Sequence, residues 1–409
     1  MGLSAYQGAV FIRFEKIRHP NTTVSDQNVI GEDMKKILLG TTAVIALGSM
    51  TTEAFAADKI QLSVGGFMKE YLGITNSDEE ATTNGSARDK DISQYTDTEI
   101  HFKGSTTLDS GIKVAATIEV EADQDGGTAD RRNVDRSFLT ISSDAVGSLV
   151  IGSAPHFGEG NLVRVPNASG NFDWDDLDDW GGIARSATGA TGAFANASAT
   201  IMGNQIGGDS AKLSYTSPTF SGVSVGASYT AAEAANASDA RRVAGTQNDG
   251  YTYGIHYSGD LGGAAVNADV TRANHGTNNT EITHAGLTVG MAGFTVGGGY
   301  SDVNDTQSVA GRTLNGSQDG NTWELGVSYA TGPYTVSAAY MKAEQVQSIA
   351  TAGDDKDTAW KIAATYDMGA GVALTANYFN LKADPEGNTA LTQTSRTING
   401  VIAGIEVGF

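Results

Sequence analysis

The sequence predicts an all-β fold, a transmembrane antiparallel β-barrel of sixteen strands. Three observations predict it: apolar and polar residues alternate in one segment after another, short turns alternate with long polar connectors, and an apolar face continues to the last residue. From Val401 to the terminal Phe409 every second residue is apolar, and in an extended chain such residues share one face. One face of the predicted sheet therefore contacts an apolar medium and the other contacts water.

Composition limits the class of protein and its partners. The 409 residues include 52 Gly, 6 Pro and no Cys, so disulfides and thiolate metal sites are unavailable. The 47 Asp and Glu outnumber the 26 Lys and Arg, which gives a net charge of −21. This charge argues against a nucleic-acid partner because phosphates would be repelled. Charged partners should be cations.

The N-terminal region predicts an export signal. Two lysines precede an apolar run over residues 37–50, and a small-residue A-x-A sequence ends at Ala56. The apolar run is too short for a membrane-spanning helix and fits a secretory signal peptide. We expect residues 34–56 to be this signal, residues 1–33 to be a non-native or over-read extension, and residues 57–409 to form the barrel.

Turn signals divide the rest of the chain into pairs of strands, of which the first is expected at Lys59 to Ile74. Each short turn supplies Gly, Pro or Asp where the backbone reverses. Short turns are expected at 109–111, 144–147, 218–222, 260–263, 291–293, 331–333 and 368–371. Long polar connectors are expected near 75–93, 123–133, 154–208, 232–249, 273–280, 303–320, 344–357 and 382–395. These seven turns and eight connectors separate sixteen strands.

An even strand number, with both ends on the short-turn side, is what a barrel of the bacterial outer membrane requires, because lipid leaves an open sheet edge unsatisfied. Aromatic residues near strand ends fit two interfacial girdles; they are Tyr71, Tyr229, Tyr257, Tyr300, Tyr329, Tyr334, Tyr340, Tyr366, Tyr378, Phe220 and Phe294. A soluble β-sandwich or an extracellular β-helix is the alternative. Sandwiches do not need an even strand number, and β-helices show a short fixed repeat that this sequence lacks.

The third long connector, residues 154–208, is the longest and the most acidic. Its segment NFDWDDLDDWGG, residues 171–182, holds five aspartates and two tryptophans. Together with the signal peptide, the sixteen-strand rhythm and the terminal Phe409, this loop makes the chain resemble the general porins of Gram-negative bacteria, especially the alphaproteobacterial sixteen-stranded kind. The resemblance covers residues 57–409.

The resemblance implies a passive diffusion channel for small hydrophilic solutes and ions, surrounded by outer-membrane lipid and assembled as a homotrimer. It implies short periplasmic turns, long extracellular loops, and a third loop that folds into the lumen, where loop acids face wall bases across an eyelet. The loop candidates are Glu159, Asp173, Asp175, Asp176, Asp178 and Asp179. The wall candidates are His101, Lys103, Lys113, Arg131, Arg132 and Arg136. Phe409 would be the signature read during membrane insertion.

The aspartate run also suggests a hypothesis of calcium binding. Crowded carboxylates repel one another unless a cation lies among them, and Ca²⁺ takes six to eight oxygens. The run departs from the EF-hand pattern, which needs Gly where Asp178 stands. Calcium at Asp173, Asp175, Asp176, Asp178 and Asp179 is therefore one interpretation, with no cofactor required, and a solvated surface loop is another. We expect Trp174 and Trp180 to anchor the loop against the wall.

The sequence predicts no catalytic site. The G-x-S-x-G segment at 222–226 lies in a predicted strand, whereas a nucleophilic serine of this pattern needs a strand-to-helix turn. The six histidines show neither H-E-x-x-H nor an i, i+4 pair. Two alternatives to a general channel stay open: a substrate-specific sugar or anion channel, and an outer-membrane barrel enzyme or adhesin. The acidic balance predicts a preference for cations.

Overall fold

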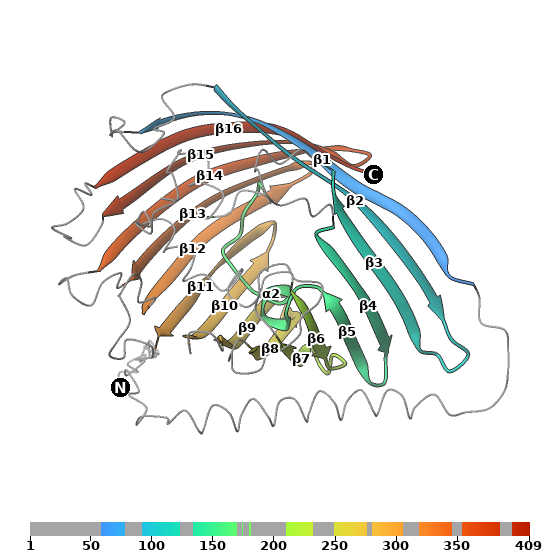
Figure 1. The fold of residues 1–409 in the computed structure, drawn as a ribbon. Helices are drawn as coiled ribbons and strands as arrows, with labels where there is room; N and C mark the ends of the chain where they lie inside the picture. Colours follow the sequence, from blue (N-terminus) through green and yellow to red (C-terminus); the bar gives the residue numbers. More distant parts are fainter. Residues whose placement is uncertain are drawn as a thin grey trace, which may run out of the picture.

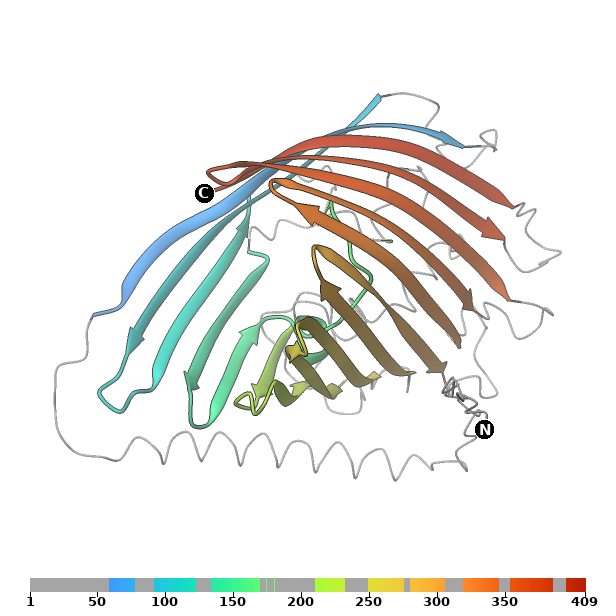
Figure 2. The same ribbon diagram turned by 180° about the vertical axis from the view of Figure 1, so that it is seen from behind.

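The structure, a computed structural model of the chain, describes residues 59–77, 92–122, 134–169, 174, 180, 210–231, 249–275, 280–305, 319–345, 354–384 and 395–409. Over these residues sixteen antiparallel strands close into one barrel (Figures 1 and 2). Every strand pairs with its neighbours in the sequence, and β1 (Gln61–Ser77) pairs with β16 (Arg396–Gly408). The predicted sixteen-stranded all-β barrel is confirmed.

The strands range from 6 residues in β6 to 17 in β1. Between β1 and β16 the strands are β2 (Ile92–Thr107), β3 (Lys113–Glu121), β4 (Arg136–Ser143), β5 (Gly147–Ser153), β6 (Ala211–Thr216), β7 (Val223–Thr230), β8 (Gly250–Leu261), β9 (Ala264–His275), β10 (Thr280–Met291), β11 (Phe294–Asp305), β12 (Gly320–Thr331), β13 (Tyr334–Gln345), β14 (Asp355–Gly369) and β15 (Val372–Asp384). A short helix, α2 (Phe157–Gly160), follows β5. In the described part of the chain no helix has the length and apolarity needed to cross a membrane.

The short turns lie where the sequence predicts them. Each of the seven predicted turns joins two strands that pair as a hairpin. In the turn between β10 and β11, Ala292 has φ 52° and Gly293 has φ 83°. Positive φ at both central residues gives a turn whose twist matches the right-handed twist of the flanking strands.

The connector between β9 and β10 is shorter than predicted. The sequence suggested a break at 273–280, but β9 runs to His275 and β10 begins at Thr280, and these two residues are paired. The polar residues at these strand ends continue the ladder, because a strand end outside the hydrocarbon layer does not need apolar side chains.

The two faces of the barrel differ in character. On β14 the outward residues Trp360 and Ile362 are 37% and 54% exposed, whereas the inward residues Ala359 and Lys361 are 0% and 1% exposed. The same alternation leaves large apolar side chains exposed on the outside of the other strands. Such an outer surface is stable against hydrocarbon and would aggregate in water.

Aromatic pairs on the outer face form two levels. Near the short turns, Phe294 lies beside Tyr329 with ring centroids 4.5 Å apart. Nearer the long connectors, Trp360 lies beside Tyr378 at 5.2 Å. Tyr71 is a correction to the predicted girdles: it is 1% exposed and faces inward, where its hydroxyl donates to Glu406 at 2.9 Å.

The C-terminal residue closes the seam between β16 and β1. The amide of Phe409 donates to the carbonyl oxygen of Gly66 at 3.1 Å, and the amide of Gly66 donates back to the carbonyl oxygen of Phe409 at 2.9 Å. The Phe409 side chain is 66% exposed on the apolar outer face. The last residue therefore contributes both ladder hydrogen bonds and a lipid-facing aromatic ring.

Deletion of Phe409 should make the chain accumulate in the periplasm. Barrels that do fold should unfold at a lower temperature, measured as the change from folded to unfolded mobility on a gel. The deletion removes both seam hydrogen bonds, and unpaired strand edges are costly in lipid. Phe409→Tyr is the control, because it keeps the backbone pair and an aromatic ring. Normal mobility and location of the deletion variant would contradict this role.

Candidate functional site in the barrel lumen

The described residues of the third long connector lie inside the barrel. We call residues 154–169, with Trp174 and Trp180, the lumenal loop; α2 lies within the ring of strands in both views (Figures 1 and 2). Three loop amides donate hydrogen bonds to inward side chains: Phe157 N to Ser228 Oγ of β7 at 2.7 Å, Val163 N to Asp269 Oδ1 of β9 at 2.9 Å, and Ala168 N to Ser337 Oγ of β13 at 2.9 Å. The loop thus follows the inner wall across these strands.

Glycines on the wall make room for the loop. A Cβ at Gly286 of β10 would collide with the carbonyl oxygen of Val163, and a Cβ at Gly326 of β12 would collide with the Val165 side chain. Any other residue at these two positions would push the loop away from the wall. Close approach of the loop therefore explains glycine in the middle of these strands.

Glu324 of β12 is the strongest anchor of the loop. Glu324 is 7% exposed, and its carboxylate accepts hydrogen bonds from Trp174 Nε1 at 2.6 Å and from the amide of Val165 at 2.8 Å. Arg164 adds an ion pair, with its Nη2 atom 3.3 Å from Oε2. A buried carboxylate is stable only when it is paired and hydrogen-bonded in this way.

Asp269 of β9 is a second buried anchor. One carboxylate oxygen accepts from the amide of Val163, and the other lies 2.9 Å from His284 Nδ1 and accepts from Thr271 Oγ1 at 3.1 Å. His284 is 2% exposed. No motif in the sequence marks Asp269, His284 or Glu324 as anchors of the loop, although alternation places all three on the inward face.

The two tryptophans of the acidic segment anchor the loop, as the sequence predicted. Trp174 is 3% exposed and its ring lies 4.4 Å from the ammonium group of Lys361. Trp180 is 5% exposed, and its carbonyl oxygen accepts a hydrogen bond from Thr75 Oγ1 at 3.0 Å. The inner wall beneath them is apolar, in contrast to the mostly polar face expected from the sequence; the cluster includes Met341, Phe379, Leu381, Ile398 and Ile402.

His156 fixes the start of the loop. Its Nδ1 atom accepts from the amide of Glu159 at 3.1 Å and so caps α2. Burial, and then the positive charge of Lys212, lower the pKa of His156 to about 3. Lys212 itself donates to the carbonyl oxygens of Ala154 and Ser210 at 2.6 and 2.9 Å. The imidazole is therefore neutral at physiological pH.

Acid should destabilise this end of the loop. The pKa of His156 is lower in the folded chain than its ordinary value of 6.5, so unfolding takes up a proton between these values. The contribution to stability is present above pH 6.5 and is lost as the pH falls toward 3. His156→Asn keeps a capping acceptor without a titrating group. The loss of thermal stability between pH 7 and pH 4 should be smaller in this variant than in the wild type.

The control for this pH experiment is His256→Asn, which removes a part-exposed lumenal histidine of β8. It should retain the wild-type pH dependence. An equal loss of stability in His156→Asn and the wild type would show that His156 does not control this response.

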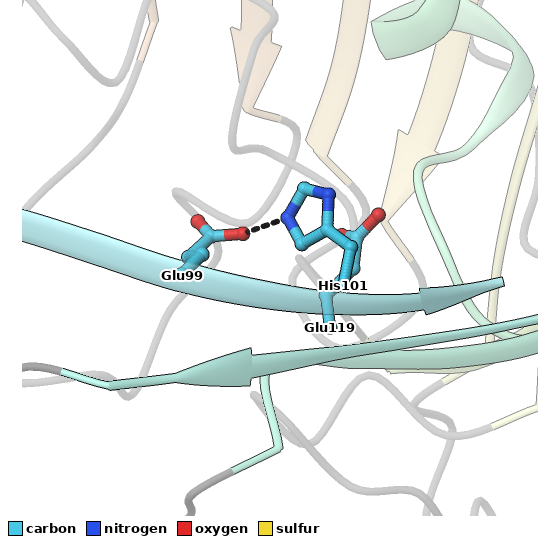
Figure 3. A group of neighbouring side chains, drawn as sticks. All are labelled: Glu99, His101 and Glu119. Carbon is cyan, nitrogen blue, oxygen red and sulfur yellow. Dashed lines mark hydrogen bonds and ion pairs between the residues drawn. The ribbon is translucent and has the colours of Figure 1, made fainter. Parts of the chain in front are cut away.

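The wall of β1 to β4 carries bases and acids together. The predicted bases His101, Lys103, Lys113 and Arg136 occupy inward positions, and they share this wall with Lys69, Asp97, Glu99, Glu119 and Glu121. His101 lies 2.7 Å from the carboxylate of Glu99 (Figure 3), and Lys69 lies 2.7 Å from that of Asp97. The wall is therefore mixed in charge where the sequence analysis expected mainly bases.

Arg136 and Glu159 are in contact, although the sequence analysis placed them on opposite sides of the eyelet. Their side chains are 3.5 Å apart, and Arg136 also lies 3.6 Å from Asp135 and 4.0 Å from Glu119. The chain enters α2 four residues after the end of β5, and β5 pairs with β4, which carries Arg136. The other predicted site residues lie outside the described residues: Arg131, Arg132, Asp173, Asp175, Asp176, Asp178 and Asp179.

Comparisons with known proteins agree with the barrel fold. Residues 41–385 match the family model described as Gram-negative porin. A comparison with curated proteins gave no significant match.

Solved structures of similar fold cover most of the chain. An anion-selective porin from Comamonas acidovorans has a TM-score of 0.56 at 18% identity, covering 86% of this chain and 100% of that one. OmpT of Vibrio cholerae, an outer-membrane protein in a trimer form, has a TM-score of 0.55 at 11% identity, with coverage of 86% and 100%. A mutant of Rh. blastica porin has a TM-score of 0.51 at 16% identity, with coverage of 85% and 100%.

Proposed function

The chain belongs to the Gram-negative porin family, and from this premise we propose that it passes small hydrophilic solutes and ions passively across the outer membrane, with a preference for cations. One observation carries the proposal: a closed barrel with an apolar outer face has a charged inner wall on β1 to β4 that keeps Lys103 and Lys113 exposed, while the backbone of loop residues 157–168 lies against the inner wall of β7 to β14. Charged side chains inside a closed barrel are stable only in contact with water or with each other.

Planar-bilayer recording tests the proposal. The purified protein should give steady conductance steps, and a salt gradient should give a reversal potential of the sign for cations. A barrel enzyme or adhesin would give no large steady conductance. A reversal potential of the opposite sign would be consistent with a channel but would refute the cation preference.

The acid balance of the chain supports the cation preference. Acids outnumber bases by 47 to 26. Trp174 and Trp180, which flank the aspartate run, are both buried in the lumen, so we assign the aspartates between them, with Asp173 and Glu159, to the constriction. Lys103 and Lys113, exposed on the wall, are the proposed opposing bases, with Arg131 and Arg132 at the mouth. The anion selectivity of the Comamonas porin belongs to that protein, because 18% identity shows the fold alone.

We also propose a homotrimer in which the outer face of β1 and β2 is covered by a second subunit. Glu70 points outward on β1, and its carboxylate accepts hydrogen bonds from Gln94 Nε2 at 3.1 Å and Thr96 Oγ1 at 2.8 Å. Its outward neighbours Leu72 and Ile405 are 57% and 41% exposed, so this polar group lies within the apolar band. A carboxylate facing lipid is costly, and a subunit interface would remove that contact.

Glu70→Leu distinguishes the two environments. At a subunit interface the substitution leaves Gln94 and Thr96 without their acceptor, so the trimer should dissociate at a lower temperature on a semi-native gel. On a lipid-facing surface the same substitution removes a costly charge and should raise the stability. Higher thermal stability would therefore contradict the interface. Glu344→Leu, at the outer rim of β13 and paired with Lys342, is the control and should leave the trimer intact.

Export is the last part of the proposal. We propose that residues 34–56 direct the chain through the periplasm and are cleaved so that the mature protein begins at Ala57, because alanines at positions 54 and 56 supply the small residues that cleavage needs. N-terminal sequencing of outer-membrane material tests this assignment. A mature sequence that begins before Met34 would contradict it.

A further inference from the structure

Three side chains on the inner wall converge on one point. Glu99 and His101 lie two residues apart on β2 and so share its inward face, and Glu119 lies directly opposite His101 on β3. Their ligand atoms all lie within 4.8 Å of one another, and His101 Nε2 is 2.7 Å from Glu99 Oε2 (Figure 3). We call these three residues the ligand triad.

The triad has the chemistry of a transition-metal site. Imidazole nitrogen and carboxylate oxygen bind Zn²⁺ at about 2.0–2.2 Å, and ligand atoms of a tetrahedral ion then lie about 3.3 Å apart. One ligand pair is already closer than that separation, at 2.7 Å. Small side-chain rotations on two rigid, adjacent strands would bring the third ligand into range. A fourth position facing the lumen stays open for water.

The charge around the triad favours a cation. Glu99 is directly opposite Glu121, and like charges in directly opposite positions of a sheet are destabilising. Arg136 is shared between Glu119, Asp135 and Glu159. Lys103, the next inward residue of β2, has an exposed side chain. A cation bound at the triad would offset the repulsion between Glu99 and Glu121.

The imidazole is held in place by its neighbours. The ring of Phe67 meets His101 edge-on, with centroids 5.8 Å apart and planes at 89°. The ammonium group of Lys69 lies 3.9 Å from the Phe67 centroid and 2.7 Å from Asp97. The side chains of His101 and Glu99 keep 17% and 18% of their surface exposed. The ligands are therefore oriented and remain reachable from the lumen.

A second group, Asp97, Glu99 and Glu121, shares one ligand with the triad. It offers oxygen atoms only, and Asp97 is already occupied by Lys69. An all-oxygen group suits calcium or magnesium, whereas an imidazole suits zinc, copper and nickel. The histidine-containing triad is therefore the better metal site.

We propose that Glu99, His101 and Glu119 bind one divalent transition-metal ion, of the class of Zn²⁺, on the inner wall of the barrel. The ion would neutralise the two lumen-facing carboxylates of Glu99 and Glu119 and so reduce cation flow. Binding itself does not depend on the proposed transport function, and it can be measured without a conductance assay.

The test is zinc binding to the full chain folded in detergent, measured by equilibrium dialysis against Zn²⁺ alone after treatment with a chelator. We expect one Zn²⁺ per subunit at neutral pH, with affinity that falls as the pH is lowered because protons compete for the ligands. His101→Gln and Glu119→Gln should each weaken binding by about tenfold or more. Heat-modifiable mobility on a gel verifies that each variant is folded.

His256→Gln is the matched control, because His256 is also an inward histidine, on β8, and lies opposite Asp269 outside the triad. It should bind zinc as the wild type does. Equal affinity of His101→Gln and the wild type would overturn the proposal. So would calcium binding of the same strength that disappears in Asp97→Asn and persists in His101→Gln, because that result would assign the ion to the all-oxygen group.

Discussion

Replacement of Glu324 by alanine should release the lumenal loop from the wall and give a larger, noisier pore current. The substitution leaves Trp174 Nε1 and the amide of Val165 without their buried acceptor, at a cost of about 1–3 kcal/mol for each orphaned donor. It also leaves Arg164 without its ion-pair partner. All three losses weaken the attachment of the loop to β12. The loop should therefore detach from the wall under conditions in which the barrel stays folded.

Fluorescence gives an independent measurement of loop release. The chain has only 4 Trp, and Trp174 is buried against Lys361 and Glu324, so its exposure to water should shift the emission to longer wavelength. Glu344→Ala is the matched control, since it removes the same charge from the outer rim of the neighbouring strand β13. If Glu324→Ala shows wild-type current and emission, Glu324 does not hold the loop.

The hairpin rhythm was predictable because it is local. A turn such as that at 291–293 is specified by a few adjacent residues, and alternation over ten residues determines which side chains share a face. The same alternation placed Glu324 inward. It could not tell that the partner of Glu324 is Trp174, which is 150 positions away in the sequence. Contacts between a loop and a distant strand depend on the closed barrel.

Alternation also says nothing about what covers each face. Tyr71 and Phe379 are aromatic residues of strands, and the sequence could equally place such residues in a girdle or under a loop. The structure buries both inside the barrel, where Trp174 and Trp180 belong to the same apolar cluster. The mixed charge of the inner wall has a similar origin, because Glu99 and Glu121 become neighbours only through the register of β2 and β3.

The aspartate run should account for most of the cation preference. Low-dielectric walls focus the field of a few uncompensated carboxylates, so ion concentrations in a narrow water path change strongly. Four of the five aspartates lie between two tryptophans that the structure buries in the lumen, and Asp173 directly precedes the first of them. Salt screens this field, with a Debye length of about 10 Å at 0.1 M and about 3 Å at 1 M.

Replacing Asp173, Asp175, Asp176, Asp178 and Asp179 with asparagine should therefore move the reversal potential toward zero, and the shift should be larger at 0.1 M than at 1 M salt. Recordings with and without a calcium chelator show whether Ca²⁺ already neutralises the run in the wild type. A charge-matched control removes the five acids of the first long connector, residues 78–91, and should shift the reversal potential less. An unchanged reversal potential at low salt, or an equal shift in the control, would place the selectivity in the overall charge of the mouth instead of in the lumenal loop.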